Sequence, residues 1–288
     1  MKNFARILLL ITALFVIASL FGCSKVENND DKIIVAVSIV PQKTFVEAVC
    51  GDEVEVLVMI PPGYSPENYE PAPRDIEKFQ ASSIYFAIGV QAEDSNILPE
   101  INEYDFPVVK LQDEVAKVYK DIDIDHGERD PHIWLSPKRV KVMVEIIADE
   151  MSLLDPDNGP IYRENAGKFL EELDKADSDI KKVLDGVETR KFIVFHPAFG
   201  YFADEYDLEM YALEEHGKEA TAQRLREMID FAKSEGIKTV FHQAETSARQ
   251  ALSFAEEIGG KTVELEPLAP DYIENLKAMA KLMSETME

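Results

Sequence analysis

The chain has 288 residues, 46% of them hydrophobic, so it can bury a large core and is long enough for two domains. Its 30 lysine and arginine residues against 55 aspartate and glutamate residues give a formal net charge of −25. A surface of this sign repels the phosphates of nucleic acids and attracts cations, although solubility alone also accounts for such a charge. We therefore expect no nucleic-acid partner.

The first segment has the features of an export signal. Lys2 and Arg6 precede an unbroken apolar run at residues 7–21. As a helix this run would span about 22 Å, short of the roughly 30 Å hydrocarbon core of a membrane. The sequence Leu20-Phe21-Gly22-Cys23 resembles a lipobox, whose cysteine becomes the lipidated N-terminus. We predict an exported protein held at the outer face of the cytoplasmic membrane through a lipid on Cys23.

The first half of the folded chain alternates strands and helices. Continuous β-branched runs are typical of strands covered on both faces, and a helical pattern between the first two predicts a parallel α/β unit. From residue 112 to residue 130 the sequence becomes acidic and loses its periodicity, which predicts a mobile loop. We predict strands at 33–40, 54–60, 84–88 and 108–111, with helices at 42–50, around 75–79 and around 97–101.

Two helices separate the halves of the chain. Ser136-Pro137 predicts the start of a helix that runs to about Leu154, with the proline in its first turn. From Pro160 to Val187 the apolar residues alternate at spacings of three and four, the stripe of one rigid helix roughly 40 Å long. Further on, strands are predicted at 192–195, 208–213, 239–241 and 262–265, with helices at 221–234, 248–258 and 272–283.

These patterns predict an α/β protein of two lobes joined by one long helix. Each lobe is expected to contain a roughly four-stranded, mostly parallel sheet flanked by helices. We expect a monomer. The predicted bounds are 1–22 for the signal peptide, 23–32 for the lipid-anchored tether, 33–158 for the N-terminal lobe, 159–187 for the linking helix and 188–288 for the C-terminal lobe.

Four potential metal ligands follow predicted strands or lie in proline-flanked loops. His132 stands between two prolines, His196 ends a strand, and Glu67 and Glu266 each come just after one. Open α/β sheets bind ligands at the carboxyl ends of their strands, so these side chains converge if the lobes face one another. Two imidazoles and two carboxylates suit a divalent transition metal, with carboxylates favouring Mn²⁺ or Fe²⁺ and imidazoles favouring Zn²⁺. Taken singly, each glutamate is more often a solvated charge, and His132 a loop residue beside a buried Trp134.

The other histidines are weaker candidates. His242 follows the strand at 239–241 and could be an accessory ligand, and His126 in the acidic loop could capture metal transiently. His216 is expected in a loop. A solvated loop histidine is the commoner alternative for His126.

Enzyme signatures are absent from the sequence. There is no Gly-x-Ser-x-Gly elbow, no phosphate-binding glycine loop after the first strand and no His-Glu-x-x-His pair. We therefore expect a protein that is not an enzyme. A metallohydrolase stays an alternative, because two histidines and a carboxylate with an open position would activate water.

The order of the motifs resembles that of the solute-binding lipoproteins of zinc and manganese ABC importers, across essentially the whole mature chain. Asp130 to Leu135 match the motif Asp-Pro-His-x-Trp-Leu in full, whereas Glu67 replaces the histidine of Pro-His-x-Tyr-Glu-Pro. His196 takes the place of a third histidine or glutamate, and Glu266 that of the aspartate in Leu-Asp-Pro-Leu.

This resemblance implies an extracytoplasmic binding component that holds one metal ion between its lobes and delivers it to an ABC permease in the membrane. The implied ligands are Glu67, His132, His196 and Glu266, and the implied metal is Zn²⁺ or Mn²⁺. Zinc members carry a histidine-rich loop before the second motif, of which this chain keeps only His126. An adhesin or interaction module on the same scaffold is the alternative function.

Overall fold

The computed structural model describes residues 32–99, 104–125, 127–214, 220–245 and 248–287. The predicted signal peptide, Cys23 and most of the predicted tether lie outside these described residues. Residues from Ile33 onward form one compact unit, and the structure below is that of this unit. Within the described part of the chain, no helix combines the length and the apolar character that crossing a membrane requires.

The first sheet has four parallel strands in the order β2-β1-β3-β4. Its central strands are buried on both faces, as their continuous apolar sequences predict: all four residues of β3 are buried. The first strand is shorter than predicted, because the following helix already begins at Val40, with Pro41 in its first turn. The strand bounds are β1 Ile33–Val37, β2 Val54–Val58, β3 Ile84–Ala87 and β4 Val108–Lys110.

Helices flank this sheet. The first of them ends at Gly51, whose φ of 59° is a backbone conformation that favours glycine. Before the predicted helical stretch around 97–101 lies a π-helical turn that ends at Ile97, and residues 100 and 101 of that stretch lie outside the described residues. The bounds are α2 Val40–Cys50, η2 Gly51–Glu53, α3 Pro73–Phe79 and η3 Glu93–Ile97.

The described residues of the acidic segment after β4 form regular elements, so the prediction of a loop throughout 112–130 was wrong. It contains helix α4 (Leu111–Ala116) and a small antiparallel hairpin of β5 (Asp123–Asp125) and β6 (Glu128–Arg129). Leu111 and Val115, one helical turn apart, are buried in the core. A helix this short offers only one such pair, too few apolar positions to establish a period.

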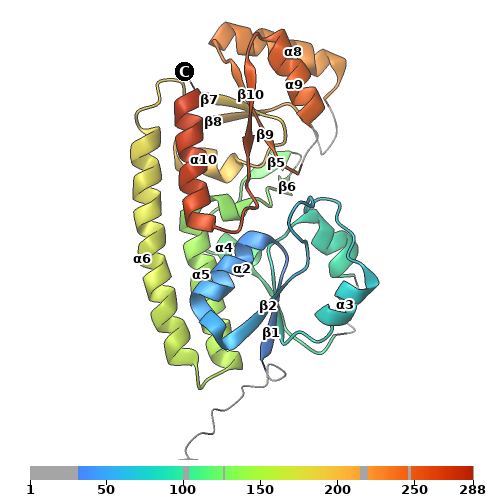
Figure 1. The fold of residues 1–288 in the computed structure, drawn as a ribbon, viewed down its shortest axis with the longest axis vertical. Helices are drawn as coiled ribbons and strands as arrows, with labels where there is room; N and C mark the ends of the chain where they lie inside the picture. Colours follow the sequence, from blue (N-terminus) through green and yellow to red (C-terminus); the bar gives the residue numbers. More distant parts are fainter. Residues whose placement is uncertain (1–31, 100–103, 126, 215–219, 246–247, 288) are drawn as a thin grey trace, which may run out of the picture. The chain divides into compact units, whose positions relative to one another are not determined.

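The two long helices are as the sequence predicts. Helix α5 (Pro137–Leu154) follows η5 (Ile133–Leu135), and the Ser136 side chain caps it by accepting a hydrogen bond from the Arg139 backbone N–H at 3.3 Å. Helix α6 (Gly159–Leu184) buries the whole predicted apolar stripe and runs beside α5 and α10 (Figure 1). Its buried residues are Gly159, Tyr162, Ala166, Phe169, Leu173, Ala176, Ile180 and Leu184.

The second sheet repeats the architecture of the first, with four parallel strands in the order β10-β9-β7-β8. The fold is therefore α/β with two lobes, each built on a four-stranded parallel sheet flanked by helices and linked by a long helix, as predicted. Helix α7 was not predicted. The bounds are β7 Lys191–Val194, α7 Gly200–Glu205, β8 Glu209–Ala212, α8 Ala222–Glu235, β9 Thr239–Gln243, α9 Ala248–Glu257, β10 Lys261–Leu265 and α10 Tyr272–Thr286.

Trp134 ties the two lobes together. Its indole N–H donates a hydrogen bond of 2.9 Å to the backbone oxygen of Pro267, and its own backbone oxygen accepts one of 2.6 Å from the Tyr272 hydroxyl. The Tyr272 ring also packs edge-on against Phe45 of α2, with 4.8 Å between ring centroids. The loop that carries His132 is thus packed against the segment that follows β10.

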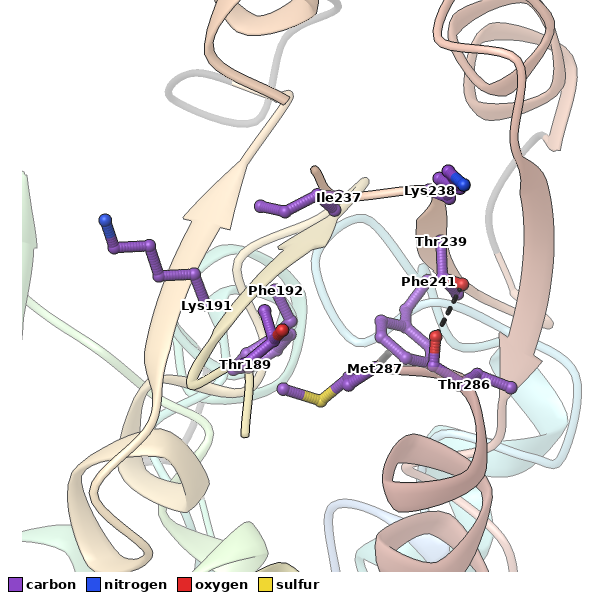
Figure 2. Close-up of a pocket in the computed structure, with 9 residues that line it drawn as sticks. All are labelled: Thr189, Lys191, Phe192, Ile237, Lys238, Thr239, Phe241, Thr286 and Met287. Carbon is purple, nitrogen blue, oxygen red and sulfur yellow. Dashed lines mark hydrogen bonds between the residues drawn. The ribbon is translucent and has the colours of Figure 1, made fainter. Parts of the chain in front are cut away.

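A small hollow lies at the amino ends of β7 and β9 (Figure 2). Phe192, Phe241 and Met287 line it, and the Thr239 hydroxyl donates a hydrogen bond of 2.9 Å to the Thr286 backbone oxygen at its edge. Its volume of about 10 Å³ admits no more than a water molecule. It lies at the ends of the strands opposite to those where the predicted ligands stand, and it is too small for a ligand.

Candidate metal centre

Three of the four predicted ligands meet between the lobes. Glu67 lies in the loop after β2, His132 directly precedes η5, and His196 follows β7. The Nε2 atom of His196 lies 2.7 Å from Oε1 of Glu67 and 3.3 Å from Nε2 of His132. Both histidines are buried and Glu67 is half-buried. Glu67 and His196 thus meet beyond the carboxyl ends of strands from the two sheets, which is where open α/β sheets bind ligands.

The spacing of the two imidazole nitrogens suits a bound metal ion. Two ligands at about 2.0–2.1 Å from a tetrahedral zinc ion stand roughly 3.3 Å apart. The measured separation of the His132 and His196 Nε2 atoms is 3.3 Å. Together with the Glu67 carboxylate on the same side of His196, these atoms provide two nitrogen donors and one oxygen donor for a divalent cation.

Glu214 is a further carboxylate at this site, and sequence reasoning missed it. It follows β8, and its Oε2 lies 2.5 Å from Nδ1 of His196. Glu67, His196 and Glu214 form a group whose potential ligand atoms all lie within 4.8 Å of one another. The signal was its position just after a strand, the same rule that selected His196. Its neighbour His216 was expected in a loop, and among many acidic residues one glutamate after a strand is more often a solvated charge.

His196 lies between two carboxylates, one at each ring nitrogen. Burial alone would lower the pKa of His196, but the hydrogen bonds that its ring donates to Glu214 and Glu67, together with the charges of these carboxylates, raise it to about 9. Burial acts to raise the pKa of Glu67, yet the hydrogen bond and charge of His196 bring it below its ordinary value. Without metal, His196 is therefore an imidazolium at neutral pH, and an ion would have to displace a proton to bind at Nε2.

His132 is held by the aspartate of its own motif. Asp130 Oδ1 lies 2.7 Å from Nδ1 of His132 and accepts a hydrogen bond of 2.9 Å from its backbone N–H. The Asp130 side chain is fully buried. A Cβ atom at Gly200 would come within 2.5 Å of the other Asp130 oxygen, so a glycine at this position makes room for the carboxylate. These contacts leave Nε2 of His132 facing His196.

The remaining candidates stand apart from this group. Glu266 is exposed at the carboxyl end of β10; its charge adds to the effect of burial in raising the pKa of Glu245. His242 is buried in β9, with Nδ1 at 3.3 Å from the backbone oxygen of Gln243. Neither belongs to the group of described residues within ligand distance around His196. His126 and His216 lie outside the described residues. Glu266 as fourth ligand and His242 as accessory ligand stay predictions.

The class of protein that these features define is a two-lobed α/β binding protein with imidazole and carboxylate groups gathered between its lobes. Residues 35–286 match the family described as zinc-uptake complex component A, periplasmic (ZnuA), and the chain belongs to this family. Members of this family are described as components of a zinc-uptake complex, which is a transport role and not an enzymatic one. This membership agrees with the resemblance found in the motifs.

Relatives of known name cover nearly the whole chain. The zinc-binding lipoprotein AdcA of Streptococcus pneumoniae is 28% identical over 292 residues, which cover 96% of this chain and 58% of that protein. The chain thus spans little more than half the length of that relative. A crystal structure of ZnuA is 34% identical, with a TM-score of 0.83 over 90% of this chain and 100% of that one. The Zn(II)-bound ZnuA-like domain of S. pneumoniae AdcA is 26% identical, with a TM-score of 0.73 over 89% and 99%.

Proposed function

We propose that the protein is the extracytoplasmic solute-binding component of an ABC importer, which captures Zn²⁺ between its lobes and delivers it to a membrane permease. The observation that carries the proposal is the 3.3 Å separation of the His132 and His196 Nε2 atoms, with Glu67 beside the second of them. Membership in the zinc-uptake family and the zinc-binding names of relatives support zinc as the cargo.

The proposed ligands are Glu67, His132 and His196, with Glu266 as the fourth. Glu266 stands at the carboxyl end of β10, next to Pro267, whose backbone oxygen Trp134 binds. Closure of the whole lobes would be limited, because α6 is one continuous helix without a hinge of flexible strands. We take residues 33–158 and 188–288 as the lobes and 159–187 as the link between them.

Manganese is the second candidate cargo. A site with two imidazoles and two carboxylates is richer in oxygen than the all-nitrogen sites that strongly favour zinc. Glu67 stands where the family motif has a histidine, so an oxygen donor replaces a nitrogen donor, which favours manganese. A comparison of the two metals on the same protein therefore belongs to the test of this proposal.

We also propose that the protein is exported, processed before Cys23 and anchored as a monomer through a lipid on that residue. The basic residues and short apolar run at the N-terminus support this, as does the lipoprotein name of the pneumococcal relative. Mass spectrometry of the protein from membranes tests it: a mature N-terminus at Cys23 with an added diacylglycerol mass is expected.

The test of metal capture is a competition titration with a chromophoric chelator, for zinc and manganese in turn. The unmodified protein should bind one zinc ion, and His132→Ala and His196→Ala should each weaken binding at least about a hundredfold. His242→Gln should have a much smaller effect, since His242 is buried within β9 with Nδ1 at 3.3 Å from the backbone oxygen of Gln243 and is proposed only as an accessory ligand. A zinc affinity left unchanged by loss of either His132 or His196 would contradict the proposal.

A further inference from the structure

The two proposed ligand histidines share one arrangement. His132 presents Nδ1 to Asp130 at 2.7 Å, and His196 presents Nδ1 to Glu214 at 2.5 Å. The opposite nitrogens of the two rings, both Nε2, face each other at 3.3 Å. In each ring, therefore, a carboxylate contacts Nδ1 while Nε2 points to the other ring.

Such a contact determines which nitrogen binds metal. A neutral imidazole carries one proton and offers the other nitrogen to an ion, and a carboxylate at Nδ1 keeps the proton there. It also fixes the orientation of the ring and makes Nε2 a stronger donor. For His132 this partner is local, because Asp130 lies two residues earlier in the same loop. For His196 the partner comes from another strand.

The pairing of β7 with β8 places that partner. The ladder runs in register to Val194 opposite Ala212 and continues past the strand ends. The backbone N–H of Leu213 donates to the Val194 oxygen, and that of Glu214 donates to the Phe195 oxygen, each at 2.9 Å. Glu214 is thus fixed directly beside His196 by sheet hydrogen bonds, and its side chain is only 11% exposed.

We propose that Glu214 is a positioning residue of the metal centre: its carboxylate holds the Nδ1 proton of His196 and so assigns Nε2 as the ligand atom. This inference rests on the proposed function. Glu214 is not itself a ligand in this arrangement, since it lies at the ring nitrogen opposite to the one that Glu67 and His132 approach. An ion at Nδ1 would lose His132 from its coordination sphere.

Long-range proton–nitrogen NMR spectra of the ¹⁵N-labelled protein with one equivalent of zinc test this directly. We expect His196 to show a metal-bound Nε2 and a protonated Nδ1, with the signals assigned by comparison with His196→Gln. Zinc bound at Nδ1 of His196 would overturn the inference. This measurement is made on the unmodified protein, so it does not depend on the folding of a variant.

The matching variant is Glu214→Gln, measured in the chelator competition. We expect its zinc affinity to fall about 10–100-fold, the range usual for loss of a carboxylate that orients a ligand histidine. Glu214→Asp, which keeps the charge, should recover part of the loss. Glu257→Gln, a change at an exposed glutamate of α9, should leave affinity unchanged.

The outcomes separate the two proposals. If the unmodified protein binds no zinc, the proposed function fails. If it binds zinc but Glu214→Gln binds equally well, only the role of Glu214 is refuted. A weaker Glu214→Gln together with a protonated Nδ1 supports it.

Discussion

The Nε2 atom of His196 lies 2.7 Å from an oxygen of Glu67, and this contact joins the end of β7 in the second sheet to the loop after β2 in the first. Each lobe thus contributes one charge to an ion pair between them. Under the proposed function, a metal ion bound at His196 would take the place of the imidazolium proton. We therefore expect this pair to influence the affinity for zinc, the free energy of unfolding of the metal-free protein and the preference between zinc and manganese.

Zinc affinity should rise with pH up to about 9. Two carboxylates raise the pKa of buried His196 to about 9, so below that pH an ion must displace a proton from Nε2. The apparent affinity should increase about tenfold per pH unit between neutrality and this value, then level off. Glu67, with its lowered pKa, stays ionised throughout. Chelator competition across this range measures the slope; a flat profile above pH 7 would refute the assignment.

The free energy of unfolding of the metal-free protein should fall as pH rises. The pKa of His196 rises from 6.5 to about 9 on folding, so its stabilising contribution is complete below 6.5 and lost as pH rises through 9. The loss is on the order of 3 kcal/mol at most. Burial also raises the pKa of Glu93 to about 7 and that of the Cys50 thiol to about 12, so both add their own pH dependence, and the His196 part is obtained by comparison with a variant. Urea unfolding of the metal-free protein measures it, and His196→Gln should remove this part of the pH dependence.

Glu67→His should shift the metal preference toward zinc. The change restores the imidazole that the family motif carries at this position and removes an oxygen donor that manganese favours. We expect the ratio of zinc to manganese affinity to rise roughly tenfold or more. Elemental analysis of protein purified without chelator, beside titrations of both metals, gives the ratio. An unchanged ratio would mean that Glu67 does not contact the ion.

Glu93→Gln should destabilise the first lobe without affecting zinc binding. The buried Glu93 carboxylate accepts hydrogen bonds of 2.8 Å from the backbone N–H groups of Ile88 and Gly89, one at each oxygen, and another from the Ser38 hydroxyl. A glutamine can accept at one end only, which leaves a buried N–H unpaired at a cost of about 1–3 kcal/mol. Urea unfolding measures the loss, and Glu257→Gln at an exposed position should change stability by less than about 0.5 kcal/mol.

Gly200→Ala should weaken zinc binding through Asp130. The added methyl group would lie 2.5 Å from an Asp130 oxygen, so the carboxylate that orients His132 must shift. We expect a loss of about 1–3 kcal/mol in stability and a lower zinc affinity. The control is Gly167→Ala in α6, where a Cβ would have no neighbour within 4 Å, and helix propensity predicts a gain of up to about 1 kcal/mol. Equal zinc affinity in both variants would show that Asp130 does not position His132.

Long elements could be predicted from the sequence nearly to the residue. Helix α5 has both predicted ends, and α6 keeps its entire apolar stripe, because a period repeated over many turns is a strong local signal. Short elements could not. Helices α4 and α7 have six residues each, and what defines them is burial against distant neighbours.

The sequence by itself determined the fold class, the order of the strands in the two parallel sheets and of the long helices, and the candidates Glu67, His132 and His196, because strand ends and long helix periods are encoded in neighbouring residues. Only the tertiary structure decided which side chains meet. It brought Glu214 to His196 through the pairing of β7 with β8, and it left Glu266 exposed at the end of β10. Such distances depend on sheet register and on the packing of two lobes, which involve residues far apart in the chain and leave no local pattern.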